Sequence, residues 1–325
     1  MIPSGPTVAR LERPRGPTTR LAVVADPHLT DRAEGTWKVY HRTIARFQAV
    51  IADVHRGAVD GVLIAGDLTK DGHPDEFQIA RELLAVLDVP YVAVPGNHDV
   101  PHETDEHTTP PIAAFERRFG PGPYPATRRV GAVDVVAVDT ASHPDGADRD
   151  SPAGSLTAEE REALEGELAA ARNPIVLAHH NLFTNEEQHG AVRIDDHHEP
   201  LAHRGSVHRS LIEHDVPLVL TGHNHWPGVA RRDGLTEVAA PAACSIPQSY
   251  LLLTIDPGGT TVELVPLADT LALEEAYQYA RAAPARSRSI AAALHEGYLS
   301  SFPLLDDGQR PTAPAHPGML RRLLH

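Results

Sequence analysis

Cysteine and lysine are the scarcest side chains that carry chemistry in this chain. A single cysteine, Cys244, excludes an intramolecular disulfide and any metal site built from several thiolates. Lysine occurs 2 times against 27 arginines, which we attribute to a GC-rich genome rather than to a physical requirement. No apolar run approaches the ~20 residues that a helix needs to span a bilayer, so we expect no membrane span.

Positive charge is also in deficit. The formal net charge of -15 argues against a nucleic-acid polymer or an anionic membrane as partner, and it is ordinary for a cytoplasmic enzyme, the location we expect. Residues 1–19 are rich in proline and arginine and have no apolar segment of a secretory signal, which predicts a disordered lead-in. The 21 histidines are unusual, because histidine is the commonest metal ligand.

Five short apolar runs, rich in β-branched residues, are typical of buried strands and end in polar residues. The runs cover residues 21–25, 61–65, 89–94, 175–178 and 218–220. The residues that follow them are Asp26 and His28; Asp67; Asn97, His98 and Asp99; His179 and His180; and His223 and His225. Open α/β sheets place their ligands at the carboxyl ends of strands. One such end means little, but five that deliver only oxygen and nitrogen ligands predict a metal site.

The spacing of these residues indicates two metals. In Asp26-x-His28 and His223-x-His225 the side chains lie two positions apart, so in an extended segment each pair can address one centre. Carboxylates mixed with imidazoles suit manganese, iron or zinc, and the lack of sulfur argues against copper(I) and iron–sulfur clusters. Two half-sites that share a carboxylate form a centre with ions ~3.5–4 Å apart. Asp67, alone at its strand end, is the expected bridge. Any one of these residues by itself is more often a simple turn residue.

The alternation of strands with helical periodicity, followed by hairpins in the second half, predicts a layered α/β sandwich. We expect one large domain over residues 20–270 and a helical extension with a proline-rich tail over residues 271–325. Residues 185–205 are polar and lack periodicity, which predicts a long loop. The loop either lies over or beside the metal cleft and helps to select the substrate, or it is a solvated excursion. Its His189, His197, His198 and His203 are expected in solvent rather than at the site.

The five motifs together resemble the calcineurin-like metallophosphoesterase superfamily over residues 20–266. The resemblance implies a four-layer αββα sandwich with a helical C-terminal extension. It implies that one metal ion is bound by Asp26, His28, Asp67 and His225. It implies that a second ion is bound by Asp67, Asn97, His179 and His223. His98 matches an outer histidine that contacts the phosphate or protonates the leaving group, and Asp99 is expected to orient it.

The residues within the motifs are most similar to those of the cyclic-nucleotide and glycerophosphodiester phosphodiesterase branch. Residues 66–72 lack the arginine of serine/threonine phosphatases, and Lys70 stands where purple acid phosphatases have a ligand tyrosine. The resemblance therefore implies hydrolysis of a small phosphodiester by in-line attack of a hydroxide that bridges two divalent ions, Mn²⁺, Fe²⁺/Fe³⁺ or Zn²⁺. A phosphomonoesterase or nucleotide phosphatase on the same centre, and a silent binding protein of the same fold, are the alternatives. The oligomeric state stays open, a homodimer included.

Overall fold

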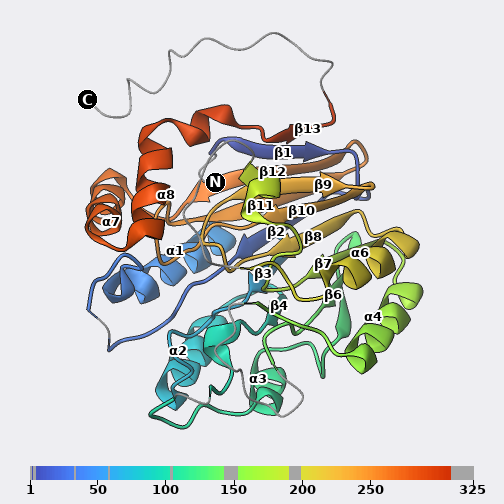
Figure 1. The fold of residues 1–325 in the computed structure, drawn as a ribbon, viewed down its shortest axis with the longest axis horizontal. Coiled ribbons are helices and arrows are strands. Elements are labelled where there is room, and N and C mark those ends of the chain that lie inside the picture. Colours follow the sequence, from blue (N-terminus) through green and yellow to red (C-terminus); the bar gives the residue numbers. More distant parts are fainter. Residues whose placement is uncertain are drawn as a thin grey trace.

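The computed structural model describes residues 2, 5–32, 34–57, 59–102, 105–142, 153–189 and 199–308. The strands in these ranges form two β-sheets (Figure 1). The first sheet has the order β13-β1-β12-β11-β2-β3-β4. Its strands are β1 (Thr7–Leu11), β2 (Thr19–Val24), β3 (Gly61–Ala65), β4 (Tyr91–Val94), β11 (Ser249–Asp256), β12 (Gly259–Pro266) and β13 (Leu305–Asp306). The second sheet has the order β5-β6-β7-β8-β10-β9. Its strands are β5 (Ala126–Val130), β6 (Val133–Ala137), β7 (Pro174–Leu177), β8 (Leu218–Thr221), β9 (Gly228–Arg232) and β10 (Leu235–Ala239).

Helices connect the strands and follow the last of them. They are α1 (Thr43–Arg56), α2 (Pro74–Leu84), α3 (Ile112–Arg118), α4 (Ala158–Ala170), α5 (Asn185–His189), α6 (Arg204–Glu213), α7 (Thr270–Ala282) and α8 (Ala285–His295), with short 3-10 turns at Tyr40–Arg42, Asn97–Asp99 and Tyr298–Ser301. Helices α7 and α8 lie where the helical extension was predicted, and residues 309–325 of the expected proline-rich tail lie outside the described residues. Within the described ranges, none of the helices has the length and apolar character needed to cross a bilayer.

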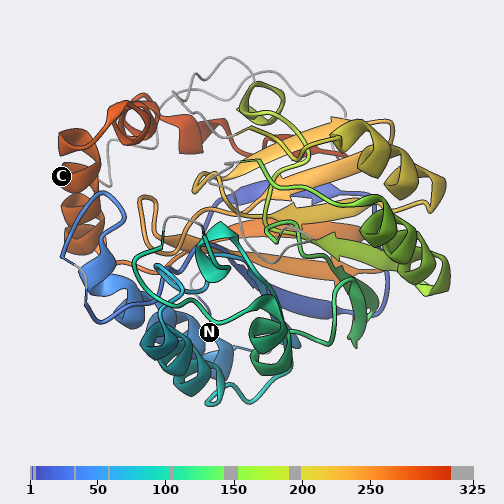
Figure 2. The same ribbon diagram turned by 60° about the horizontal axis from the view of Figure 1, so that its bottom comes forward.

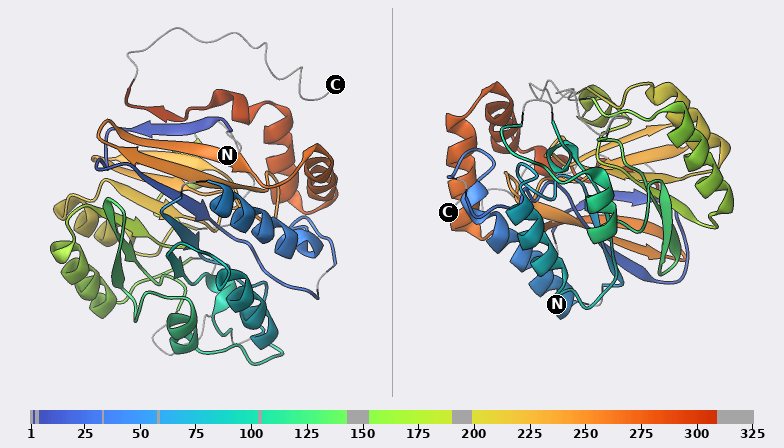
Figure 3. Two further views of the ribbon diagram at one scale, coloured as in Figure 1. Left: turned by 180° about the vertical axis from the view of Figure 1, so that it is seen from behind. Right: turned by 90° about the horizontal axis from the view of Figure 1, so that it is seen from below.

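Alternating side chains divide the molecule into layers. Leu21 and Val23 of β2 lie in a core between the two sheets. Val24 points the other way and packs in a second core with Phe47 of α1 and Phe77 of α2. A third core joins the outer face of the second sheet to α4 and α6. Helices α1 and α2 therefore cover one side of the paired sheets, and α4 and α6 cover the opposite side (Figures 2 and 3). This arrangement confirms the predicted αββα sandwich.

The N-terminal segment is more ordered than its composition suggested. Residues 1–19 were expected to be disordered, but Thr7–Leu11 forms β1, antiparallel to β12 and parallel to β13. The prediction was wrong there because Val8 and Leu11 are buried between the sheets, so five residues suffice to dock the strand despite the prolines around it. Strand β2 likewise begins at Thr19, within the range expected to be disordered.

The polar segment over residues 185–205 is only partly the predicted loop. It begins with helix α5 (Asn185–His189) and ends in α6, which starts at Arg204. His189 is buried, and its Nδ1 lies 3.0 Å from the hydroxyl of Tyr298, so this histidine is structural rather than solvated. His203 precedes α6 as its N-cap residue. His197 and His198 lie outside the described residues.

Glu237 of β10 is a buried polar junction that sequence reasoning did not find. Its carboxylate accepts hydrogen bonds from the backbone N–H groups of Leu182 (2.7 Å) and Phe183 (2.9 Å). It also accepts from Gln188 Nε2 (3.0 Å) and from the Thr221 hydroxyl (3.0 Å). The side chain is fully buried, and burial raises its pKa above the usual range. The loop after β7 is therefore tied to β8 and β10 through one side chain.

Glu237→Ala should destabilise the fold by about 2–5 kcal/mol, because several buried donors lose their acceptor at once. The free energy of unfolding from urea titration followed by circular dichroism measures this. Glu162→Ala on the exposed face of α4 is the matched control and should change it by less than about 0.5 kcal/mol. Equal stability of the two variants would show that Glu237 is not a structural junction.

Candidate metal centre

The five predicted strand ends meet at one edge of the sandwich. Strands β2, β3 and β4 of the first sheet and β7 and β8 of the second all lead directly into the predicted site residues. Five of these residues have a positive φ angle: Asp26 (48°), His28 (44°), Asp67 (49°), His223 (68°) and His225 (58°). Aspartate and histidine tolerate the left-handed region better than most residues do. The tight turns thus use the same residue types that can bind a metal.

Glycines allow the loops to approach each other. Gly66 has a φ of 85°, and a Cβ at this position would meet the imidazole of His179 from the other sheet. A Cβ at Gly96 would meet the carboxylate of Asp67. The glycines that precede Asp67 and Asn97 are therefore needed for the close contact between strand ends.

Asp67 lies between two groups of imidazoles. Its Oδ2 is 3.3 Å from His28 Nε2, and its Oδ1 is 3.4 Å from His179 Nε2. The backbone N–H of His98 donates a hydrogen bond of 3.0 Å to the same Oδ1. The side chains of Asp67, His28 and His179 are almost completely buried. The carboxylate is thus held with one oxygen toward each half of the site.

The first half of the site brings together the four residues predicted for one ion. The donor atoms of Asp26, His28, Asp67 and His225 all lie within 4.8 Å of one another, and all four residues are buried. His225 Nε2 is 3.5 Å from Asp26 Oδ1. Cys244 lies beside this group, with Sγ 3.8 Å from His225 Nδ1. Burial raises the pKa of the Cys244 thiol well above its usual range.

The second half contains the remaining predicted ligands. His179 Nε2 lies 3.1 Å from both Asn97 Oδ1 and His223 Nδ1. His179 Nδ1 donates to the carbonyl oxygen of Ala65 at 2.9 Å, so the lone pair of Nε2 faces the site. Such a hydrogen bond fixes the tautomer and ring orientation of metal-binding histidines. His180 joins this group: its ring lies 4.5 Å from that of His223, which the sequence left undecided.

His98 and Asp99 have different surroundings from those expected. His98 Nδ1 donates to the carbonyl oxygen of Lys70 at 2.6 Å. Asp99 instead accepts hydrogen bonds from the backbone N–H groups of Leu68 (2.9 Å) and Thr69 (2.8 Å). The ring of His98 is therefore oriented by Lys70 and not by Asp99. The carboxylate of Asp99 shapes the loop after Asp67, and burial, then Asp67, raises its pKa to about 6.

The electrostatics of the site favour cations. Burial, together with the charge of Asp67, raises the pKa of Asp26 well above its usual range. Burial acts in the same direction on Asp67, but His179, His98 and Lys38 outweigh it and hold its pKa at about 2. Two buried carboxylates that interact so strongly are stabilised by a divalent ion between them. The donor set of carboxylate, imidazole and amide oxygen fits manganese, iron or zinc.

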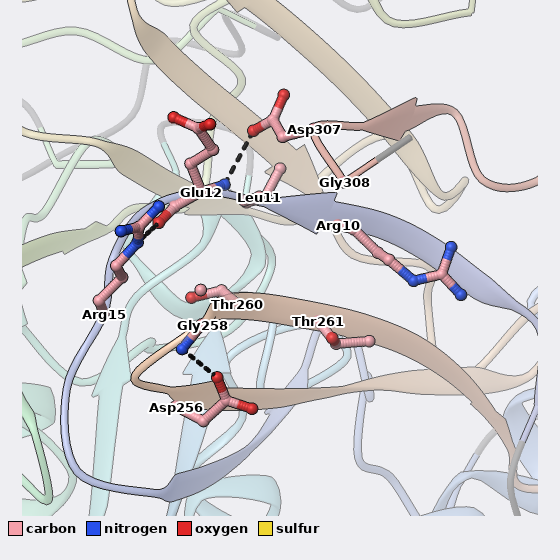
Figure 4. A pocket seen from close by; sticks show the side chains of 11 residues that line it. Arg10, Leu11, Glu12, Arg15, Asp256, Gly258, Thr260, Thr261, Asp307 and Gly308 are labelled. Carbon is pink, nitrogen blue, oxygen red and sulfur yellow. Dashed lines mark hydrogen bonds between the residues drawn. The ribbon is translucent and has the colours of Figure 1, made fainter. Parts of the chain in front are cut away.

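Another hollow, of about 230 Å³, lies where the end of β1 meets the β11–β12 turn (Figure 4). Several of its charged groups are already paired: the Asp307 carboxylate accepts from Glu12 N (2.8 Å), and Asp256 Oδ1 accepts from Gly258 N (2.6 Å). Arg15 Nε donates to the Glu12 carbonyl at 2.6 Å. None of the predicted site residues lines it. We assign it no role.

Comparison with known proteins gives the family. Residues 19–227 match the model of the calcineurin-like phosphoesterases, which is well over half of the chain and includes all five strand ends. The chain belongs to the calcineurin-like phosphoesterase family. This family uses divalent metal ions, and the Asp/His clusters described above can bind them.

Two curated relatives of this phosphoesterase match over most of their lengths. A probable cyclic nucleotide phosphodiesterase of a Synechococcus strain is 24% identical over 263 residues, which cover 78% of this chain and 94% of that protein. The 3',5'-cyclic adenosine monophosphate phosphodiesterase CpdA of Escherichia coli is 26% identical over 265 residues, with 75% and 85% coverage. The suspected branch of the family is thereby confirmed as the one to which the chain is similar.

Solved structures support the fold of this phosphoesterase. A dimetal phosphatase from Danio rerio is similar with a TM-score of 0.56 and 12% identity, and the match covers 78% of this chain and 98% of that one. A purple acid phosphatase from yellow lupin has the same TM-score at 15% identity, with 78% and 52% coverage. At these identities the likeness concerns the fold alone.

The structure of this phosphoesterase also adds residues that the motifs did not reveal. Lys38 Nζ lies 3.2 Å from His28 Nε2 and 3.4 Å from His98 Nε2. Arg286 of α8 donates to the carbonyl oxygen of Asn224, between two predicted ligands, at 2.6 Å. No motif in the sequence places Lys38 or Arg286 near the candidate site.

Proposed function

We propose that this chain is a metal-dependent phosphodiesterase with two divalent ions. The observation that carries the proposal is the placement of Asp67, whose two oxygens lie 3.3 Å from His28 Nε2 and 3.4 Å from His179 Nε2. A buried carboxylate between two donor clusters is suited to two ions ~3.5–4 Å apart, the spacing used for displacement at phosphorus.

Each half of the site would hold one ion. The first ion would be bound by Asp26, His28, Asp67 and His225. The second would be bound by Asp67, Asn97, His179 and His223. Ions of this kind, Mn²⁺, Fe²⁺/Fe³⁺ or Zn²⁺, supply charge stabilisation at the phosphoryl oxygens and activate water at neutral pH.

His98 would act on the leaving group. Because its Nδ1 donates to Lys70, Nε2 is the nitrogen available for proton transfer. Burial, then the charge of Lys38, lowers the pKa of His98 to about 4, so the ring is neutral in the free protein at pH 7. A bound phosphate anion favours the imidazolium, which can then donate a proton from Nε2 to the departing alkoxide. General acid catalysis of this kind contributes ~10²–10⁴-fold.

The substrate class follows from similarity rather than from geometry. The relatives described as cyclic nucleotide phosphodiesterases, at 24% and 26% identity, support a phosphodiester of low molecular weight. The net charge of -15 disfavours a nucleic-acid polymer as substrate. A phosphomonoesterase or nucleotide phosphatase on the same centre is the alternative that the assay below must separate.

Chelation should abolish activity, and Mn²⁺ should restore it together with about two ions per chain by elemental analysis. The reloaded protein should then have a higher kcat/KM for the diester bis(p-nitrophenyl) phosphate than for the monoester p-nitrophenyl phosphate. It should also hydrolyse 3',5'-cyclic AMP, which represents the diesters of the relatives. The reverse preference would make the protein a monoesterase. Full activity in a verified metal-free sample would contradict the metal-dependent mechanism.

A further inference from the structure

The segment between β2 and α1 brings a lysine into the candidate centre. Lys38 Nζ lies 3.2 Å from Nε2 of His28, a proposed ligand, and 3.4 Å from Nε2 of His98, the proposed proton donor. In the proposed function, the phosphoryl group must lie between the metal ligands and His98. The ammonium group of Lys38 is therefore at the boundary of the space that the reacting phosphate has to occupy.

The use of lysine at this position is itself unusual for the chain. The sequence has 27 arginines and 2 lysines, and one of the lysines, Lys38, places its ammonium group beside His98. The contact of Lys70 with His98 is made by its backbone carbonyl. Lysine offers a compact point charge on a flexible stem, whereas arginine is a wider planar fork. The ammonium group of Lys38 lies within 3.4 Å of two imidazole nitrogens, a position that suits a compact cation. The geometry, and not the composition, is therefore the evidence for Lys38.

Val39, the next residue, fixes the direction of Lys38. It has a φ of 44°, a conformation that is a genuine outlier for a β-branched residue. Its side chain is fully buried in a small core with Ala280 of α7 and Ile290 of α8. Such a backbone persists only where the surrounding packing enforces it. The two C-terminal helices therefore hold the backbone that presents Lys38.

Further contacts connect the same helices to the segment. The ring of Trp37 lies 5.2 Å from that of His225, and Arg286 of α8 lies 5.7 Å from the centre of the Trp37 ring. Arg42, just before α1, donates to Glu275 of α7 at 3.1 Å. Helices α7 and α8 lie next to this part of the chain in the views of Figures 1 and 2. The C-terminal extension thus forms one wall of the site.

We propose that Lys38 is a substrate-binding residue that donates to a non-bridging phosphoryl oxygen and that the α7–α8 extension holds it in place. The proposal rests on the proposed function, because it requires a phosphate ester at this centre. If two divalent ions are bound, like-charge repulsion would direct the ammonium group away from the ligands and toward the anion. A charge-assisted hydrogen bond of this kind adds to the contribution of the ions.

The test compares binding of inorganic phosphate to Mn²⁺-loaded wild type, Lys38→Met and Arg32→Met by isothermal titration calorimetry. Arg32 is the matched control, because it is a cation of the same segment that pairs at the surface with Asp75. Lys38→Met should keep its metal by elemental analysis and weaken phosphate binding by roughly 10–100-fold. Arg32→Met should bind phosphate like the wild type. Lys38→Gln, which keeps a polar stem, replaces Lys38→Met if that variant does not fold.

Each outcome separates the two proposals. If the wild type hydrolyses diesters and the Lys38 variant binds phosphate as the wild type does, Lys38 is not a substrate-binding residue. Loss of metal from the Lys38 variant alone would also overturn the inference, since it would assign the lysine to the metal site. If the wild type turns over no phosphate ester while phosphate binding still depends on Lys38, the proposed function fails and the anion site remains.

Discussion

Asp67→Ala should abolish turnover and lower the metal content of the protein below one ion per chain. The carboxylate faces both halves of the site, so its removal takes one ligand from each proposed ion and leaves Asp26 as the remaining carboxylate of the first cluster. Loss of a residue that only supports a metal ligand already costs about 10–100-fold in affinity. Loss of a shared ligand should cost more. Elemental analysis and the rate with bis(p-nitrophenyl) phosphate measure the two effects.

Asp75→Ala is the appropriate control for this variant. Asp75 lies in the first turn of α2, close in sequence to Asp67, but its side chain is exposed and pairs with Arg32. Metal content and rate should be those of the wild type. If Asp67→Ala folds, as judged by its circular dichroism spectrum, and retains two ions, the bridging role is refuted.

His98→Ala should keep its metal and slow hydrolysis of an alkyl diester such as a glycerophosphodiester by ~10²–10⁴-fold. The reason is that Nε2 of His98 is available for proton transfer while Nδ1 is bound to the Lys70 carbonyl. The loss should be much smaller for bis(p-nitrophenyl) phosphate, because p-nitrophenolate leaves readily without a proton. The ratio of the two losses therefore reports on proton donation rather than on binding.

His55→Ala provides the histidine control. His55 lies at the end of α1 with its side chain 41% exposed, and the rates with both substrates should be those of the wild type in this variant. Equal losses for the alkyl and the nitrophenyl substrate in His98→Ala would reassign His98 to phosphate binding. Loss of metal comparable to that in Asp67→Ala would place it among the ligands.

Local motifs made most of the site predictable. Each of the predicted ligands, from Asp26 to His225, follows a strand directly, and the carboxyl ends of neighbouring parallel strands necessarily meet at one edge of a sheet. The sequence could therefore indicate which residues lie together at this edge, even though the paths of the helices and loops between the strands were not known. The αββα layers followed from the resemblance, because periodicity alone does not show how two sheets stack.

Residues that reach the site from elsewhere in the chain were not predictable. Lys38 comes from a connecting segment, and Arg286 from a helix 60 positions beyond the last ligand, so no spacing rule relates them to the centre. Glu237 reads as an ordinary polar strand residue, since burial of a carboxylate depends on four donors from other segments. The orientation of His98 was misjudged for a related reason: the acceptor is a backbone carbonyl, which every residue has.

The division of the ligands between the two sheets has a thermodynamic consequence. Asp26, His28 and Asp67 follow strands of the first sheet, whereas His179 and His223 follow strands of the second. An ion can be bound by both groups only while the sheets are docked, so its binding free energy is added to the free energy of unfolding. By mass action, an ion at 100 times its dissociation constant contributes about 2.7 kcal/mol. Metal binding would then stabilise the packing of the two sheets against each other, and the midpoint temperature of thermal unfolding would rise with the concentration of the free metal ion.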